Sequence, residues 1–212
     1  MDGVLEKITL YDILGYFVPG SLLVVICLLG ADPKDLISHL EQWADYKGGL
    51  YFVFFLISYL AGIVLSEVMA WAWKPLIALV GKENKIPKEI TSEQILAALK
   101  KSGVCDEEDS IKTKMEEDFM GYYFPYMYGI IQKSDSYKRI HNYASAYVLY
   151  KNVAGALILG ACTMLRNDVS NKWIGTVCII MSIVFGVRGV RFQEKRNRYA
   201  IIWFVEKFTR EG

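Results

Sequence analysis

Four long stretches of this chain are apolar and nearly free of charge, and they constrain its fold more than any other feature. They cover residues 13–30, 50–73, 143–165 and 173–187. A helix needs roughly 20 predominantly apolar residues to cross the hydrocarbon core of a bilayer, and the first stretch reaches about 27 Å at a rise of about 1.5 Å per residue. The sequence therefore predicts an all-α integral membrane protein with four transmembrane helices and a small helical cytoplasmic domain.

The fourth stretch is the shortest of the four, because Arg188 follows it directly. Long arginine side chains can extend from a buried helix to the lipid headgroups. We therefore expect the fourth helix to continue to about Phe192, with Arg188 and Arg191 at the membrane surface. Whether residues 173–187 alone complete a span stays open.

Lysine and arginine are distributed unevenly about these stretches, with 19 on one side of the predicted membrane and four on the other. Basic residues concentrate in cytoplasmic loops, so both termini and the long middle segment are expected in the cytoplasm. This orientation divides the chain into transmembrane helices one and two within residues 1–80, a cytoplasmic helical domain at 81–142, helices three and four within 143–187, and a basic amphipathic tail at 188–212.

The middle segment carries the sequence signs of a folded domain. Thr91 and Gln94 fit a capping box before the run ILAALKK, Gly103 is a helix stop signal, and a second helix is expected at about 110–117. Residues 119–131, FMGYYFPYMYGII, are rich in aromatics but too short to span a bilayer. Two interpretations of them stay open: a packed or interfacial segment, or an aromatic platform for a nucleotide or a lipid headgroup.

Aromatic and basic side chains are interspersed along residues 191–208. A helix of this kind suits the inner membrane surface, and it equally suits packing on the 81–142 domain or on a neighbouring subunit. The residues expected at the membrane surface are Arg188, Arg191, Lys195, Arg196, Arg198 and Trp203.

Small residues recur at every fourth position of the second stretch, namely Ser58, Gly62, Ser66 and Ala70. They lie nearly along one helix face, where another helix can approach the backbone closely. We expect them to mediate helix packing, either within the chain or between chains.

Each of the two middle stretches contains a single charge, Glu67 in the second and Lys151 in the third. At about 1.5 Å per residue they lie roughly 9 Å and 12 Å from the cytoplasmic boundary. A lone charge in the hydrocarbon costs about 2.5–3.5 kcal/mol on insertion scales, so we expect the two to pair, within a chain or between chains. Such a pair is either a structural clasp or a charged gate in a pore.

Pro19 and Gly20 interrupt the inner half of the first stretch. Proline inside a helix bends it, so this dipeptide is expected to act either as a hinge or as an ordinary packing device. Both interpretations place a bend within the membrane.

No sequence motif for catalysis or cofactor binding is present. The chain has no P-loop, no dinucleotide-binding glycine pattern, no nucleophile elbow, no zinc-protease motif and no CxxC pair. We therefore predict that it is not an enzyme, and we predict no catalytic residues, no cofactor site and no metal site. A net charge of +1 gives no reason to expect direct nucleic-acid binding.

The segments YDILGYFVPG, ISYLAGIVLS and YASAYVLYKNVAGAL, which belong to the first three stretches, are similar to small bacterial multi-span membrane proteins. Some proteins of that kind lie in antiviral defence islands as membrane effectors. The resemblance covers the spans and not residues 81–142. It implies a protein of the bacterial inner membrane, an effector that acts as an assembly.

Two functions are compatible with this architecture. The first is an oligomeric channel or pore-like effector that is gated through its cytoplasmic domain. The second is a non-conducting membrane anchor or sensor that recruits a cytoplasmic protein partner. Both need the lipid bilayer and the first needs a homo-oligomer, while the small number of polar residues in the spans argues against a wide aqueous pore.

Overall fold

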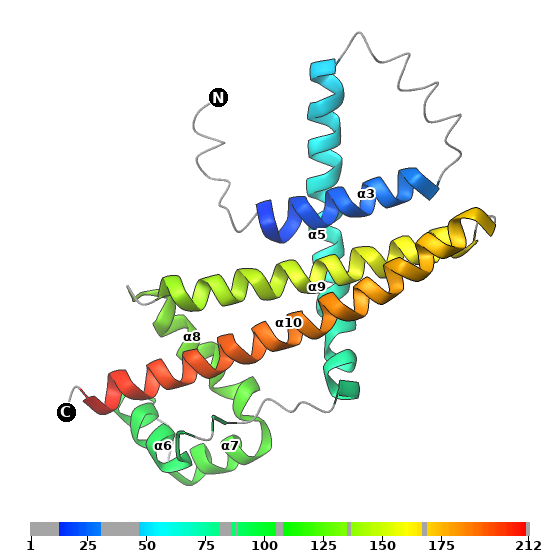
Figure 1. The fold of residues 1–212 in the computed structure, drawn as a ribbon. Coiled ribbons are helices and arrows are strands. Elements are labelled where there is room, and N and C mark those ends of the chain that lie inside the picture. Colours follow the sequence, from blue (N-terminus) through cyan, green and yellow to red (C-terminus); the bar gives the residue numbers. More distant parts are fainter. Residues whose placement is uncertain are drawn as a thin grey trace. The chain divides into compact units, whose positions relative to one another are not determined.

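A computed structural model describes the backbone of residues 13–30, 47–80, 86–87, 89–104, 108–134, 137–166 and 169–210. Every regular element in these residues is a helix (Figure 1). The chain divides into two compact units: unit 1 comprises Met1–Leu79 and Ser145–Arg191, and unit 2 comprises Val80–Ala144 and Phe192–Gly212. The N-terminus and the loop at 31–46, on which the predicted orientation partly depends, lie outside the described residues.

Three helices in the described part of the chain are long and apolar enough to cross a membrane, namely α5 (Lys47–Val80), α9 (Tyr137–Arg166) and α10 (Val169–Arg210). The first predicted span is a shorter apolar helix, over Ile13–Leu28, so its crossing of the bilayer stays a prediction. The fourth predicted span lies inside α10, which continues through Arg188 without a break, as expected. The chain is thus an all-α protein with three candidate membrane spans and one shorter apolar helix.

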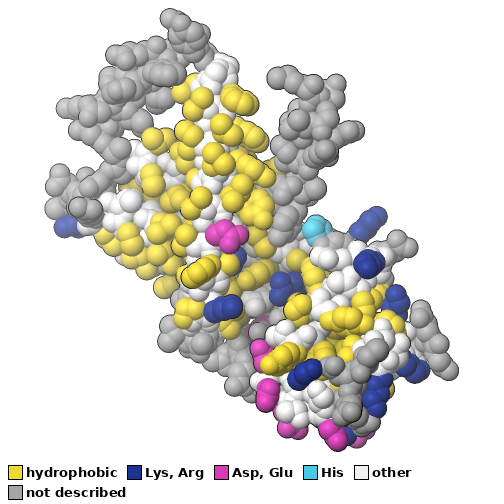
Figure 2. Space-filling model, turned by 180° about the vertical axis from the view of Figure 1, so that it is seen from behind, with side chains coloured by type: hydrophobic (Ala, Val, Ile, Leu, Met, Phe, Trp, Pro, Cys, Tyr) yellow, Lys and Arg dark blue, Asp and Glu magenta, His cyan; other side chains and the backbone are white. Residues whose placement is uncertain are grey.

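The surface of α5 fits a lipid environment. Tyr51 is 73% exposed and Trp71 is 83% exposed, and large apolar side chains between them are exposed as well. At about 1.5 Å per residue these two aromatics are separated by about 30 Å along the helix, which matches the thickness of the hydrocarbon core. Aromatic residues favour both membrane interfaces. Figure 2 shows hydrophobic side chains gathered over this part of the molecule, and together these features indicate an integral membrane protein.

Unit 2 contains the short helices α6 (Ser92–Lys101), α7 (Glu108–Tyr122) and α8 (Phe124–Gln132). The Gln94 amide N–H donates to the Thr91 hydroxyl at 3.3 Å, and the Thr91 N–H donates to the Gln94 side chain at 2.9 Å. The predicted capping box is therefore confirmed. It satisfies two N–H groups that the first turn of α6 would otherwise leave without acceptors.

The ends of these helices also follow from particular residues. Gly103 has a φ of 96°, a left-handed conformation that favours glycine, and it lies just beyond the end of α6 as predicted. The second helix expected at about 110–117 lies within α7. Asp118 interrupts α7 with a φ of −156° and a ψ of 78°, and its carboxylate accepts a hydrogen bond from the Gly121 N–H at 2.9 Å.

The core of unit 2 joins the aromatic segment to the C-terminal part of α10. Every fourth residue of the aromatic segment is buried, namely Phe119, Tyr123, Met127 and Ile131. These side chains share two buried clusters with residues of α10, namely Ala200, Ile201, Phe204 and Val205. Residues 119–131 are thus a packed segment. The part of α10 that begins at Phe192 belongs to unit 2 with α6, α7 and α8, which is one of the arrangements expected for the tail.

Candidate functional site

Helix α3 (Val18–Gly30) crosses α5 with direct backbone contact (Figure 1). A Cβ atom added at Gly20 would fall on the backbone carbonyl of Ser58, closer than 3.0 Å, and one added at Gly62 would fall on the carbonyl of Tyr16. Ser58 itself is 0% exposed. Two of the small residues predicted for helix packing therefore pack within the chain, and only small residues permit this approach.

The turn before α3 is π-helical. Residues Ile13–Phe17 form a π-helical turn, η1, which lies directly before Pro19 in the sequence. Proline has no N–H, and its ring clashes with the carbonyl four residues earlier, here that of Gly15. The Asn152 side chain, from α9, donates to the Gly15 carbonyl at 2.8 Å and is 0% exposed. This hydrogen bond satisfies a carbonyl that the proline deprives of its usual helical donor.

The predicted hinge, Pro19 and Gly20, lies at this crossing. The Pro19 side chain is fully buried, and Gly20 touches the backbone of α5. These contacts hold the start of α3 against α5, which fits the packing interpretation. Hinge motion stays a prediction.

The lysine of the third predicted span is buried inside unit 1. Lys151 is 5% exposed, its Nζ donates to the Ser66 carbonyl at 3.4 Å, and it lies 5.7 Å from the centre of the Tyr147 ring. Glu67, the residue after Ser66, is exposed, and so is Ala70, the last small residue of the stripe. The two predicted charges thus meet the same level of α5, but the hydrogen bond shown for Lys151 goes to the backbone. The Glu67–Lys151 ion pair stays a prediction.

A third polar contact joins α9 and α10. The Ser182 hydroxyl is 4% exposed and donates to the Ala154 carbonyl at 2.9 Å. Asn152, Lys151 and Ser182 therefore share one arrangement, in which a buried donor reaches a backbone carbonyl of another helix. Sequence reasoning expected the lysine to pair with a carboxylate and missed the other two contacts. Their only sequence signal is a polar side chain within an apolar run.

Hydrogen bonds from buried side chains to backbone carbonyls of other helices are typical of helices that associate in a bilayer. No protein family, no curated protein and no solved structure matches this chain. Within the described ranges, His, Cys, Asp and Glu side chains form no group of three that could hold a metal ion. The function is therefore inferred from the contacts within the chain itself.

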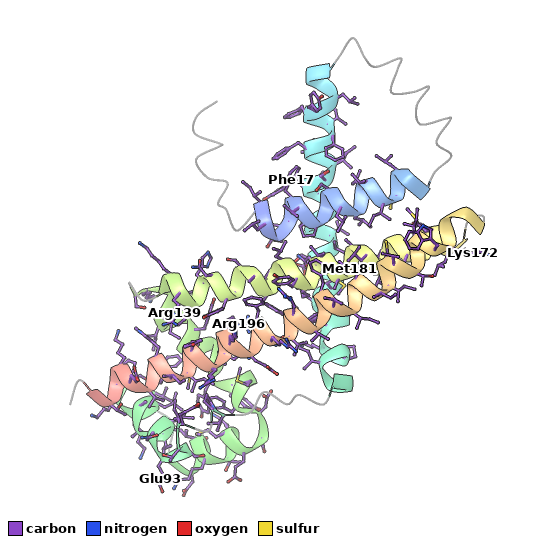
Figure 3. The ribbon with its side chains drawn as sticks, in the orientation of Figure 1. Phe17, Glu93, Arg139, Lys172, Met181 and Arg196 are labelled. Carbon is purple, nitrogen blue, oxygen red and sulfur yellow. The ribbon has the colours of Figure 1, made fainter. Side chains whose placement is uncertain are left out.

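In unit 2, two basic side chains of α10 lie close to aromatic rings. The Arg196 guanidinium lies 5.3 Å from the centre of the Phe124 ring and donates to the Asn197 side chain (Figure 3). The Lys207 ammonium lies 5.2 Å from the centre of the Trp203 ring, which packs against the core of unit 2. Arg196 and Trp203, both expected at the membrane surface, thus take part in the packing of unit 2.

The other residues predicted at the membrane surface are exposed, namely Arg188, Arg191, Lys195 and Arg198. Arg198 forms an ion pair with Glu89 within unit 2, with side chains that are 56% and 52% exposed. A pair this exposed contributes little to stability. Contact of these residues with lipid headgroups stays a prediction.

A groove with a volume of about 430 Å³ opens between α6 and α7. Its lining residues are Ile86, Ser92, Glu93, Leu96, Lys112, Met115 and Glu116. Three of them are apolar and three are charged, two of these with carboxylates. Glu93 lies on α6 (Figure 3), so the groove combines an apolar lining with a partly acidic edge.

Proposed function

We propose that this chain anchors unit 2 at the cytoplasmic face of a bacterial inner membrane, where unit 2 binds a protein partner. The observation that carries the proposal is the arrangement of the buried donors of unit 1. Lys151, Asn152 and Ser182 each donate to a backbone carbonyl of a neighbouring helix. Donors engaged in this way hold helices together and do not line a path for water or ions. Unit 1 is therefore better suited to anchoring than to conduction.

The orientation rests on the distribution of basic residues, 19 against four, which favours a cytoplasmic unit 2. The exposed Trp71, near the predicted cytoplasmic end of its span, is also typical of a residue at the membrane interface. With this orientation, α6 and α7 face the cytoplasm and can meet a partner there.

The groove between α6 and α7 is the proposed partner site. Its apolar residues Ile86, Leu96 and Met115 suit apolar side chains of a bound segment, and Glu93 with Glu116 suits basic ones. Charge complementarity of this kind sets specificity and the rate of association more than affinity. The partner is therefore a protein segment that carries both apolar and basic side chains, as an amphipathic helix does.

A second candidate function is an oligomeric channel or pore-like effector, which the resemblance to membrane effectors of antiviral defence implies. The exposed Glu67 favours it. A carboxylate on the outside of a membrane helix can line or gate a path only where subunits meet.

Two measurements separate these functions. Purified protein in liposomes is expected to pass no ions, whereas an ion flux that Glu67→Gln changes would favour the channel instead. Photo-crosslinkers at Leu96, in the groove, and at Thr113, exposed on α7 and outside the groove lining, test the partner site in cells.

We expect a crosslinked partner from position 96 only. The double substitution Glu93→Lys and Glu116→Lys should abolish that product, because it removes the acidic edge of the groove. Equal crosslinking from positions 96 and 113 would contradict the proposed site.

A further inference from the structure

The outer face of α5 carries a charge that the contacts of a single chain do not explain. Leu65 is 1% exposed and Met69 is 5% exposed, and they mark the side of α5 that packs within unit 1. At about 100° per residue, Glu67 stands almost opposite to them. Its neighbours one turn away are Val64, 63% exposed, and Trp71, 83% exposed. Apolar side chains on this face need only lipid, but an ionised carboxylate there is stabilised by a neighbouring cation.

Glu67 lies within the apolar stretch of α5, at some distance from its end. Glu67 precedes Trp73 by six residues, so it lies about 9 Å inside the end of the apolar stretch at about 1.5 Å per residue. Lys151, the buried lysine of unit 1, donates to the backbone carbonyl of Ser66, and no ion pair with Glu67 is shown. No hydrogen bond or ion pair is shown for Glu67 among the described residues, and a second copy of the chain can supply a cation at a suitable depth.

Helix α10 presents that cation at the end of an exposed apolar face. Ile180 is 56% exposed, Val184 is 49% exposed and Val187 is 43% exposed, and Arg188 follows them as an exposed residue. At about 100° per residue these four positions lie on one side of α10. This side is complementary to the outer face of α5, which is apolar with one carboxylate.

Arg188 also lies at the right level of the molecule. A Cβ atom added at Gly189, the next residue, would lie 3.0 Å from the Trp73 ring, so this part of α10 is level with the end of the α5 apolar stretch. Helical side chains lean towards the N-terminus of their helix, and α10 approaches the cytoplasm at Arg188 in the predicted orientation. The long Arg188 side chain can therefore reach towards the depth of Glu67 as well as towards the headgroups.

We propose that α5 of one copy packs against α10 of a second copy in the membrane, and that Glu67 pairs with Arg188 of the partner subunit. A planar guanidinium can bind a carboxylate through two parallel hydrogen bonds, which suits a pair in hydrocarbon better than an ammonium does. This interface lies in unit 1, so it is independent of the partner groove in unit 2.

Cysteine crosslinking in native membranes tests the interface. The natural cysteines are first replaced by serine or alanine, namely Cys27, Cys105, Cys162 and Cys178. Two tagged chains are then co-expressed, one with Leu60→Cys and the other with Ile180→Cys, which lie on the two proposed faces. The control pair is Val68→Cys with Val187→Cys. Val68 is as exposed as Leu60, at 50% against 53%, but it points about 100° away from Glu67. We expect a mixed dimer from the first pair and little from the control.

Charge reversal tests the ion pair itself. Glu67→Arg and Arg188→Glu are each expected to lower crosslinking of the Leu60–Ile180 pair, and the chain with both reversals should regain it. A strong polar contact between membrane helices corresponds to about a tenfold change in the dimerisation constant. Glu67→Gln replaces Glu67→Arg if the arginine prevents insertion, and it should also weaken the dimer.

Two results would overturn the proposal. Equal crosslinking of the first and the control pair would mean that lipid, and not a second copy, covers the outer face of α5. Specific crosslinking that no charge reversal alters would mean that Glu67 and Arg188 do not pair.

Discussion

Replacing Asn152 by leucine is expected to destabilise unit 1 by about 1 kcal/mol, because hydrogen bonds between membrane helices average about 0.6 kcal/mol and reach about 1.7 kcal/mol. The contact from Asn152 to the Gly15 carbonyl is 2.8 Å long and fully buried, which favours the upper part of that range. The Asn152 Oδ1 atom has no hydrogen-bond partner, so its removal offsets part of the loss. Leucine also fills most of the space, which keeps the cavity contribution small.

Pro19 supplies the decisive comparison. Pro19→Ala gives residue 19 an N–H that can donate to the Gly15 carbonyl within the helix, so Asn152→Leu should then cost little. The two substitutions together should destabilise less than the sum of their separate effects, by about 0.6–1.7 kcal/mol. Ser182→Ala is the matched control. It removes a 2.9 Å contact to Ala154, which Pro19 does not influence, so its effect should add to that of Pro19→Ala.

The assay is the free energy of unfolding in mixed micelles, measured by titration with a denaturing detergent and followed by tryptophan fluorescence. The informative quantity is the coupling energy of the double-mutant cycle, because it cancels the separate effects of each substitution on packing. Additive effects of Asn152→Leu and Pro19→Ala would refute the link between the proline, the Gly15 carbonyl and Asn152.

Three further substitutions test individual elements of the fold. Gly62→Ala should destabilise unit 1 by about 1–3 kcal/mol, because the added methyl group meets the backbone of η1. Gly186→Ala is the control, since it has open space and should leave the melting temperature unchanged. Equal shifts of the melting temperature in both variants would contradict the close crossing of the two helices. Thr91→Ala should destabilise α6 by about 1 kcal/mol and speed amide exchange there, and unchanged exchange would show that the capping box contributes nothing. Phe204→Ala, at a site that is 0% exposed, should destabilise unit 2 by about 3–5 kcal/mol and make it sensitive to limited proteolysis, and full resistance would mean that α10 does not complete its core.

Local features of this fold could be predicted from sequence and distant ones could not. The capping box at Thr91 depends on residues within one turn, so its sequence signal and its structure coincide. The contact from Asn152 to Gly15 joins positions 137 residues apart, and an asparagine in an apolar run does not reveal which carbonyl it meets. Pro19 indicated a bend, but the carbonyl that it leaves without a donor becomes informative only when α9 is placed beside η1.

The direction in which each side chain of α5 points also could not be predicted from the sequence. A helix that is apolar on all sides gives no periodic signal of which face packs and which meets lipid. Depth along the helix predicted that Lys151 lies level with Glu67, and the Lys151 ammonium donates to the carbonyl of the neighbouring Ser66. Rotation about the helix axis decides that the lysine meets the Ser66 carbonyl while Glu67 lies exposed, and only the packing of Leu65 and Met69 reveals that rotation.

The central claim is that the apolar helices of unit 1 cross the membrane and hold unit 2 on its cytoplasmic side. A membrane-impermeant maleimide tests it on single cysteines placed at Glu93, in the groove of unit 2, and at Trp173, 70% exposed near the start of α10. We expect Trp173→Cys to be labelled in intact cells, and Glu93→Cys to be labelled only after the membrane is permeabilised. Labelling of Glu93→Cys in intact cells, or of both positions alike, would contradict the claim.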